Sequence, residues 1–134
     1  MKDVMELITK HEGIRLHPYR DSVGKLTIGV GHNLDDNGIS LATAQFMLEE
    51  DIANAVSELK DIFEGWDELP DTVQAVLTDM MFNLGYNRFI KFKRMIAAIR
   101  IQDFKQAAKE AKDSKWCAQV GSRCLENISI LQNS

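Results

Sequence analysis

The stretch "HEGIRLHPYRDSVGKLTIGVGH", residues 11–32, decides the fold because the spacing of apolar residues changes within it. Helical spacing leads up to it and predicts a helix from Asp3 to Glu12 that Gly13 ends. Short extended pieces with a turn at residues 22–25 follow, and they predict a small β-hairpin between Ile14 and Val30. The chain therefore begins with one helix and a small β element.

Helical spacing returns after Ser40 and persists to the end of the chain. A long amphipathic helix is expected at about 40–63, because apolar residues recur there at steps of four and three: Leu48, Ile52, Ala55, Leu59 and Ile62. Further helices are expected over about 69–134, with Gly85 after one of them and Asp103 before another. The sequence predicts an α+β fold that is mostly α, in a single domain of residues 1–134.

The composition is that of an ordinary globular protein, with 134 residues, 45% hydrophobic and 27% charged. Charged residues interrupt every apolar run, so we expect no membrane span, and Lys2, Asp3 and Glu6 argue against a signal peptide. On one continuous helix Cys117 and Cys124 would lie about 10 Å apart. Gly121 could bend the chain between them, but free thiols are the favoured expectation.

Charge is unevenly distributed along the chain. Residues 88–123 contain ten Lys/Arg and three Asp/Glu, whereas residues 1–87 contain six Lys/Arg and sixteen Asp/Glu. A basic region of this kind attracts polyanions such as nucleic acid or cell wall. A solvated helical surface explains it equally well.

Two carboxylates in the N-terminal stretch point to acid–base chemistry. Glu12 ends a helix, where the negative pole of the macrodipole opposes an ionised carboxylate and favours one that keeps its proton, as a general acid must. Asp21 lies in a polar turn, where solvent and hydrogen bonds favour the ionised form. Two carboxyls in different surroundings are typical of a divided acid/base pair.

Alternation along the expected strand 26–31 places Leu26, Ile28 and Val30 on one, core-like face. Thr27, Gly29 and Gly31 share the other face, which is almost bare. Such a face suits a cleft wall on which an extended substrate lies, although glycines in strands also form bulges.

These residues resemble the catalytic segment of the phage-type lysozymes, glycoside hydrolase family 24. The resemblance is carried by "EGIRLHPYRD", by the spacing of Glu12, Asp21 and Thr27, and by "TIGVGH". It continues more weakly through "FNLGYNRF" and "SKWCAQVGSR". It implies a lysozyme-like fold, with a β lobe at about 12–38, a linking helix at about 40–63, and a helical lobe at about 69–134 on which the first helix packs.

The resemblance implies a muramidase that hydrolyses the β-1,4 bond from N-acetylmuramic acid to N-acetylglucosamine in peptidoglycan, with inversion. Glu12 matches the general acid, and Asp21 and Thr27 match the residues that hold and activate the attacking water. Some relatives that lack the aspartate are lytic transglycosylases, so the presence of both Asp21 and Thr27 favours hydrolysis. No cofactor is implied.

Supporting roles follow from the same resemblance. Arg123 matches an arginine that pairs with the catalytic glutamate, and His32 is expected to form a buried, structural ion pair with Asp51. Phe82, Asn83 and Gln119 match positions that line the saccharide cleft, although Phe82 suits the core equally well. The tryptophans Trp66 and Trp116 are expected to pack rather than to bind sugar.

The expected partner is the peptidoglycan glycan strand, bound by a monomer without nucleic acid or stable membrane insertion. The protein is expected to stay in the host cytoplasm until a separate holin-like pore releases it to the wall. Two alternatives are a catalytically silent wall-binding or phage structural module and a nucleic-acid binder that uses residues 88–123. A metal enzyme is disfavoured, since His11, His17 and His32 lack zinc-ligand spacing.

Overall fold

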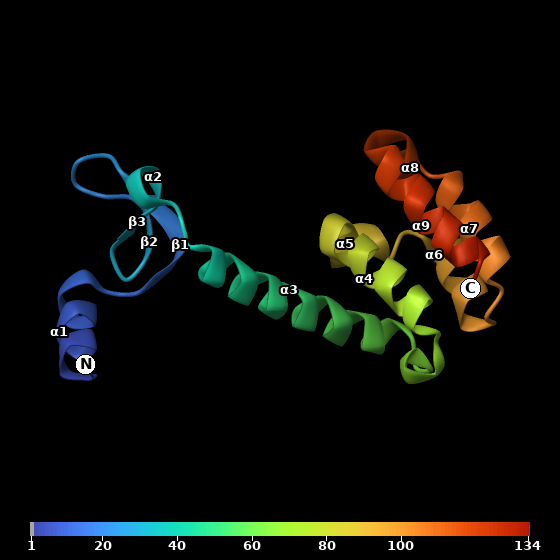
Figure 1. The fold of residues 1–134 in the computed structure, drawn as a ribbon, viewed down its shortest axis with the longest axis horizontal. Coiled ribbons are helices and arrows are strands. Elements are labelled where there is room, and N and C mark those ends of the chain that lie inside the picture. The colour runs from blue at the N-terminus through green and yellow to red at the C-terminus, as the bar shows by residue number, and fades with distance from the viewer. Residues whose placement is uncertain (1) are drawn as a thin grey trace. The chain divides into compact units, whose positions relative to one another are not determined.

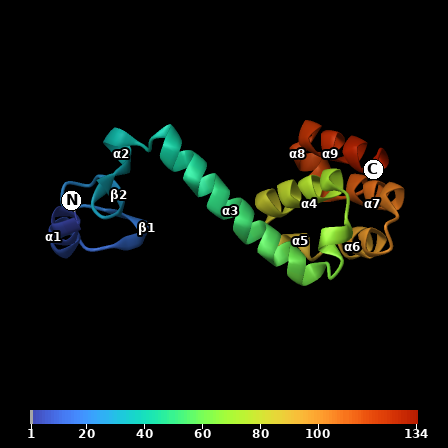
Figure 2. The same ribbon diagram turned by 60° about the horizontal axis from the view of Figure 1, so that its bottom comes forward.

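The structure is a computed structural model and describes residues 2–134. It divides the chain into two compact units: the first ends at Met47 and the second spans Leu48–Ser134. Helix α3 (Leu41–Ile62) begins in the first unit and continues into the second (Figures 1 and 2). No helix within residues 2–134 has the length and apolarity needed to cross a membrane.

The first unit contains a three-stranded antiparallel sheet between two helices in sequence. Its elements in chain order are α1 (Lys2–Glu12), β1 (Arg15–Arg20), β2 (Leu26–Gly29), β3 (His32–Asn33) and α2 (Leu34–Asn37). The strands lie in the order β1-β2-β3, so β2 is central. The expected hairpin is thus extended by β3, which at two residues is too short for its spacing to be read from the sequence.

The expectation for the two faces of β2 was wrong. Thr27 is the buried residue of this strand, 3% exposed, whereas Leu26 and Ile28 are only partly buried and Val30 is exposed. In the central strand, Thr27 pairs with Tyr19 of β1 on one side and with Asn33 of β3 on the other. The strand ends at Gly29, which has a positive φ of 70°, so alternation stops before Val30.

The second unit is helical throughout its regular structure. After α3 it contains the 3-10 turn η1 (Trp66–Glu68) and the helices α4 (Asp71–Leu84), α5 (Tyr86–Phe89), α6 (Lys93–Arg100), α7 (Phe104–Lys112), α8 (Lys115–Val120) and α9 (Ser122–Gln132). Gly85 ends α4 and Asp103 caps α7 by accepting a hydrogen bond from the Gln106 amide, both as expected.

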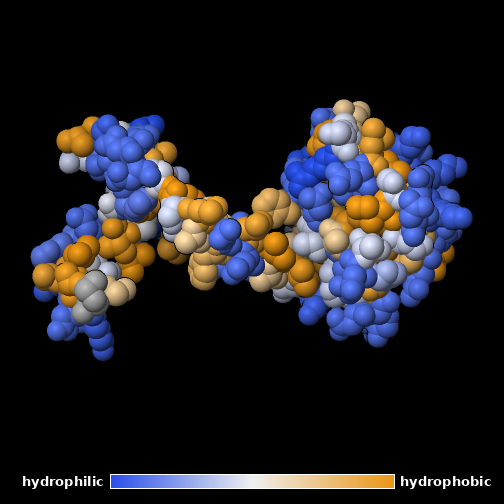
Figure 3. Space-filling view, in the orientation of Figure 1, coloured by the Kyte–Doolittle hydropathy of each residue, from blue (hydrophilic) through white to orange (hydrophobic). Residues whose placement is uncertain are grey.

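One hydrophobic core holds the second unit together. Its fully buried side chains come from six helices, α3, α4, α5, α6, α7 and α9, and they include Leu59, Leu77, Met80, Phe89, Met95, Ile99 and Leu131. Helix α7 packs against both α6 and α9. Of the stripe expected on α3, Ala55 and Leu59 are buried, but Leu48 and Ile52 stay exposed, as do Leu41, Phe46 and Met47. Figure 3 shows hydrophobic residues at the surface along α3.

The expectation that both cysteines are free was also wrong. Cys117 and Cys124 form a disulfide, with their Cα atoms 5.1 Å apart. Gly121 has a positive φ of 58° and separates α8 from α9, so the two residues do not lie on one continuous helix. The bend at Gly121 removes the 10 Å separation on which the expectation rested.

Candidate functional site

Glu12 is the last residue of α1, and its carboxyl group lies directly against Gly31. A Cβ placed on Gly31 would lie 2.6 Å from Glu12 Oε2 and 2.9 Å from its Cδ, closer than atoms of this kind approach. Helix α1 ends there because Gly13, at a φ of 74°, donates its amide to the Thr9 carbonyl. The sequence "EG" at 12–13 therefore places the glutamate at the helix end, and Gly31 leaves room for it.

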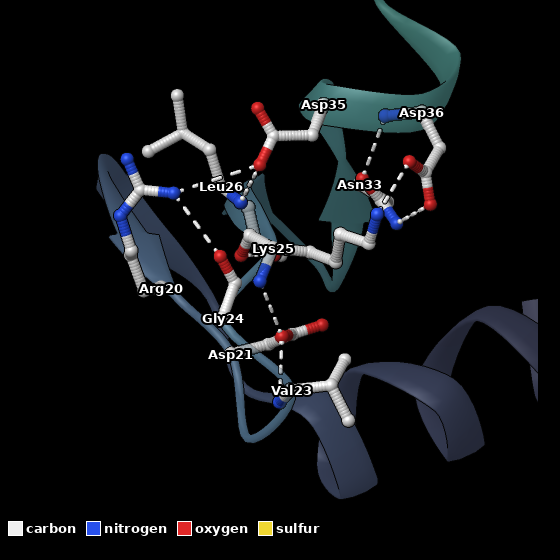
Figure 4. Close-up of polar contacts among 10 residues, drawn as sticks. Arg20, Asp21, Val23, Gly24, Lys25, Leu26, Asn33, Asp35 and Asp36 are labelled. Carbon is white, nitrogen blue, oxygen red and sulfur yellow. Dashed lines mark hydrogen bonds and ion pairs between the residues drawn. The ribbon is translucent and has the colours of Figure 1, made fainter.

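Asp21 is fixed in the turn between β1 and β2 (Figure 4). Its Oδ1 accepts hydrogen bonds from the backbone amides of Val23 at 3.0 Å and Lys25 at 2.8 Å. Its own amide donates to the Lys25 carbonyl at 2.9 Å. Among residues 2–134 no donor contacts Oδ2, so this half-buried carboxylate has a fixed orientation and one oxygen left for a ligand or water.

Thr27 is held by the same residue that holds Asp21. Its buried hydroxyl donates to the carbonyl of Lys25 at 2.8 Å, while the amide of Lys25 donates to Asp21. The hydroxyl keeps its lone pairs as acceptors for a further donor. One peptide segment thus fixes the two groups that the sequence assigned to the attacking water.

Helix α2 stabilises this turn through two aspartates. Asp35 accepts the amide of Leu26, and Asp36 pairs with the Lys25 ammonium at 2.9 Å (Figure 4). Asn33 caps α2 through Asp36, accepting its amide and donating to its carboxylate. These contacts fix the start of β2, and therefore the position of Thr27. They come from residues that follow β2 in the chain, whereas the Asp21 turn precedes it.

In the second unit, Asn83 and Trp116 form a direct contact. The indole of Trp116 donates to Asn83 Oδ1 at 2.7 Å, and Trp116 is 3% exposed. Trp116 and Trp66 are buried, which confirms that both pack rather than form open sugar platforms. Gln119 lies on α8 and lines the same cavity as Trp116.

Phe82 is not a core residue, since 48% of it is exposed at the end of α4. It lines a pocket of about 590 Å³ with Ile52, Trp66, Asp79 and Arg123. The pocket belongs entirely to the second unit. Of the two readings that the sequence left open, the structure excludes the core position and leaves Phe82 available to a ligand.

Arg123 forms a two-pronged ion pair with Asp79. Its Nε and Nη2 donate to the two carboxylate oxygens at 3.0 and 2.7 Å, and the buried Asn127 also donates to Asp79. Arg123 hydrogen bonding, the Asn127 contact and the charge of Arg123 lower the pKa of Asp79, against an opposing effect of burial. The Asp79 hydrogen bond in turn raises the pKa of Arg123. The expected pairing of Arg123 with Glu12 stays a prediction.

His32 lies in the first unit, where its Nε2 contacts the backbone carbonyl of Gly38. Its expected ion pair with Asp51, which lies in the second unit, stays a prediction. Within the described part of the chain, no three His, Cys, Asp or Glu side chains come together as metal ligands.

A family model described as phage lysozyme matches residues 9–129. The chain belongs to the phage lysozyme family. The mostly helical α+β fold and the assignment to lysozyme-type glycoside hydrolases are therefore confirmed.

Individual relatives of this lysozyme are distant in sequence. The pre-baseplate central spike protein Gp5 of Enterobacteria phage T4 is 25% identical over 94% of the chain, and the chain spans 27% of that protein. Probable T4-type lysozyme 2 of Dictyostelium discoideum is 24% identical over 98% of this chain and 95% of its own length. A SAR-endolysin of Bacteriophage PS119 is 25% identical over 84% of this chain and 66% of its own length.

The sequence did not reveal four contributors to these arrangements. Lys25 contributes through its backbone, and Gly31 contributes because it has no Cβ. Neither contribution depends on a side chain, so the residue types do not predict them. Asp79 had one available signal, because it is a carboxylate next to the apolar stripe of α4. Asn127 had the same signal among the apolar residues of α9, where it is buried.

Proposed function

We propose that the protein is a muramidase that hydrolyses the β-1,4 bond between N-acetylmuramic acid and N-acetylglucosamine of peptidoglycan, with inversion at the anomeric carbon. Membership of the phage lysozyme family supports the enzyme class. The first unit supports the chemistry, because it presents a carboxyl group at a helix end, a fixed carboxylate and a fixed hydroxyl.

In the proposed reaction, Glu12 donates its proton to the glycosidic oxygen as the bond from that oxygen to the anomeric carbon breaks. A water held by Asp21 and Thr27 attacks the carbon from the opposite face, and Asp21 accepts the proton that the water loses. The products are two sugar chains, one with a reducing muramic acid end. Inverting glycosidases place their carboxyls about 6.5–9.5 Å apart so that this water fits between them.

The observation that carries the proposal is that the backbone of Lys25 binds both Asp21 and Thr27: its amide donates to Asp21 and its carbonyl accepts from Thr27. A general base must be oriented as well as ionised, and the two amide donors to Asp21 Oδ1 fix the direction in which Oδ2 points. Because Thr27 is anchored to the carbonyl of the same residue, the base and its hydroxyl partner keep their relative positions. A wall-binding module without catalysis has no need for this arrangement.

Turbidity assays on outer-membrane-stripped bacterial cells test the proposal. We expect clearing by the wild-type chain and loss of clearing with Glu12→Gln and with Asp21→Asn, which keep the shape of each side chain. Glu126→Gln, an exposed change on α9, is the matched control and is expected to clear like wild type. Clearing by Glu12→Gln at the wild-type rate would overturn the role of Glu12.

Analysis of the soluble products separates hydrolysis from transglycosylation. Hydrolysis leaves reducing muramic ends that carry an oxygen from labelled water, whereas transglycosylation leaves anhydro-muramic ends without it. The first anomer formed, followed by nuclear magnetic resonance, decides inversion. Absence of clearing by the wild-type chain would favour the silent wall-binding module.

The proposed biological setting is lysis of a bacterial host. We propose that the protein acts as a monomer, stays in the host cytoplasm until release, and reaches the wall through a separate holin-like pore. Expression in a bacterial host with and without a pore-forming partner tests this route: lysis only with the partner supports it. Lysis by the chain alone would contradict the dependence on a separate pore.

A further inference from the structure

The second unit contains an open cavity of about 600 Å³ that has both cationic and apolar side chains in its lining. Five of its lining residues are basic, and they are Arg88, Lys91, Lys93, Arg94 and Lys115. We call these five residues and the cavity that they line the basic pocket. Its aromatic wall is formed by Phe92 and Trp116, which meet edge to face with ring centroids 6.2 Å apart.

The cations of the basic pocket are not neutralised by the protein itself. None of the five forms an ion pair with a carboxylate anywhere in residues 2–134. The pocket has one acidic residue, Glu110, which accepts a hydrogen bond from Gln106. The site therefore has a net charge of about +4 at neutral pH, counting one charge for each group at its ordinary state.

The position of two of these cations is unfavourable for the fold. Lys93 and Arg94 occupy the first turn of α6, which contains no acidic residue. A cation at that end of a helix faces the positive pole of the macrodipole and is destabilising. Stabilisation of the helix therefore does not account for these two cations.

The basic pocket adjoins the residues expected to contact the glycan. Gln119 lines it, and Trp116 joins it to Asn83 through the indole hydrogen bond. A glycan strand held by Gln119 and Asn83 would bring groups attached to that strand into the pocket. The two arginines present planar, forked donors, which match phosphate oxygens.

We propose that the basic pocket binds the phosphodiester groups of an anionic polymer attached to the cell-wall glycan. This inference rests on the proposed function, because it assumes that the protein meets the wall. A duplex nucleic acid suits the site less well, since it needs a continuous basic track and residues 1–87 have a net charge of −10.

Binding to insoluble walls tests the proposal without hydrolysis of the substrate. The full chain with Glu12→Gln is incubated with walls that carry a glycerol-phosphate polymer and with the same walls after hydrofluoric acid has removed it. We expect removal to weaken binding by about tenfold, and added salt to reduce the difference. Equal binding to both walls would overturn the proposal.

Charge variants locate the effect on the protein. Lys91→Glu with Arg94→Glu, made in the same Glu12→Gln chain, is expected to bind both walls equally. The matched control is Lys105→Glu with Lys109→Glu, which makes the same change of charge on α7, outside the pocket, and should keep the tenfold difference. All four residues are exposed. The variant with Lys91→Gln and Arg94→Gln removes the two positive charges without adding negative charges that would repel the wall polymer.

Two further outcomes contradict the proposal. Equal loss in the pocket and control variants would mean that overall charge, not the pocket, attracts the wall. Retention of a DNA fragment that depends on the pocket, without any dependence on wall phosphate, would assign the site to nucleic acid. Hydrolysis of phosphate-free walls by the chain with Glu12 intact is measured separately, so failure of the muramidase proposal is distinguishable from failure of this one.

Discussion

The carboxyl group of Glu12 occupies the space that a side chain at Gly31 would need. An ideal Cβ on Gly31 would lie 2.6 Å from Glu12 Oε2. Gly31 also has a φ of 65°, which L-residues rarely adopt. A glycine is therefore needed at position 31 for two reasons: the backbone has a positive φ, and the carboxyl group proposed as the general acid fills the space of a side chain.

Gly31→Ala is expected to lose activity beyond its loss of stability. The positive φ costs about 1–2 kcal/mol for alanine, and the methyl group must also displace Glu12. A displacement of about 1 Å at a catalytic group lowers rates by about 100-fold. The rate per folded molecule, measured with urea unfolding on the same preparation, checks this.

Gly38→Ala is the control that separates these two effects. Gly38 has a φ of 56°, and a Cβ there would meet no atom within 4 Å. We expect a similar loss of stability with nearly wild-type activity per folded molecule. If both variants lose the same activity, backbone strain alone explains Gly31, and the contact with Glu12 has no catalytic role.

Thr27→Val tests whether the hydroxyl acts on water or only packs. Valine keeps the shape of this buried residue, and the Lys25 carbonyl still accepts the amide of Asp21, so the loss of stability should stay near 1 kcal/mol. We expect kcat to fall by about 100-fold, within the usual range for a positioned proton-transfer group. Thr27→Ser, which restores the hydroxyl, should recover most of it; wild-type kcat in Thr27→Val would leave the residue a purely structural role.

The Asp79–Arg123 pair predicts how stability depends on acid. The pKa of Asp79 in the folded state lies below its ordinary value of 3.8, chiefly because of the Arg123 hydrogen bonds. A lowered folded-state pKa contributes stability that is present above the unfolded-state pKa and is lost as pH falls through the folded-state value. The free energy of unfolding of the wild type should therefore decline below about pH 4.

Asp79→Asn is expected to flatten that decline. At neutral pH it should cost about 1–3 kcal/mol, because Arg123 loses its ion pair and one of the two oxygens that accept from Arg123 and Asn127 is replaced by an NH₂ donor. Urea unfolding between pH 7 and the acid range measures both effects, with Glu126→Gln on α9 as the control. The same acid-side slope in Asp79→Asn and wild type would assign the decline to other carboxylates.

Much of the architecture was readable from residue spacing. The long helix was expected at about 40–63 and spans Leu41–Ile62, because its apolar residues from Leu48 to Ile62 keep a helical period over about four turns. Gly13 and Gly85 marked helix ends correctly, since a glycine there adopts the positive φ that ends a helix. Spacing therefore sufficed where an element was long or ended on a glycine.

The errors fell where short-range geometry outweighs spacing. The strand β3 and the helix α2 have two and four residues, too few for a period, although Asn33 followed by Asp36 is a usable capping signal. For the candidate site, the sequence supplied Glu12, Asp21 and Thr27 through their resemblance to a family. The hydrogen bonds by which the Lys25 backbone links Asp21 to Thr27 depend on the folded geometry, and the residue types do not predict them.

The disulfide between Cys117 and Cys124 predicts a redox-dependent stability. It closes a ring of eight residues, for which chain entropy gives about 2.5 kcal/mol of stabilisation at 25 °C. The bridged residues lie next to Trp116 and Arg123, which contact α4 through Asn83 and Asp79.

We expect Cys117→Ser with Cys124→Ser to lower the free energy of unfolding by about 2.5 kcal/mol. A reducing agent should destabilise the wild type but not the double variant. Equal unfolding curves for the wild type with and without the reducing agent, once thiol titration confirms that the bond is broken, would contradict this stabilisation.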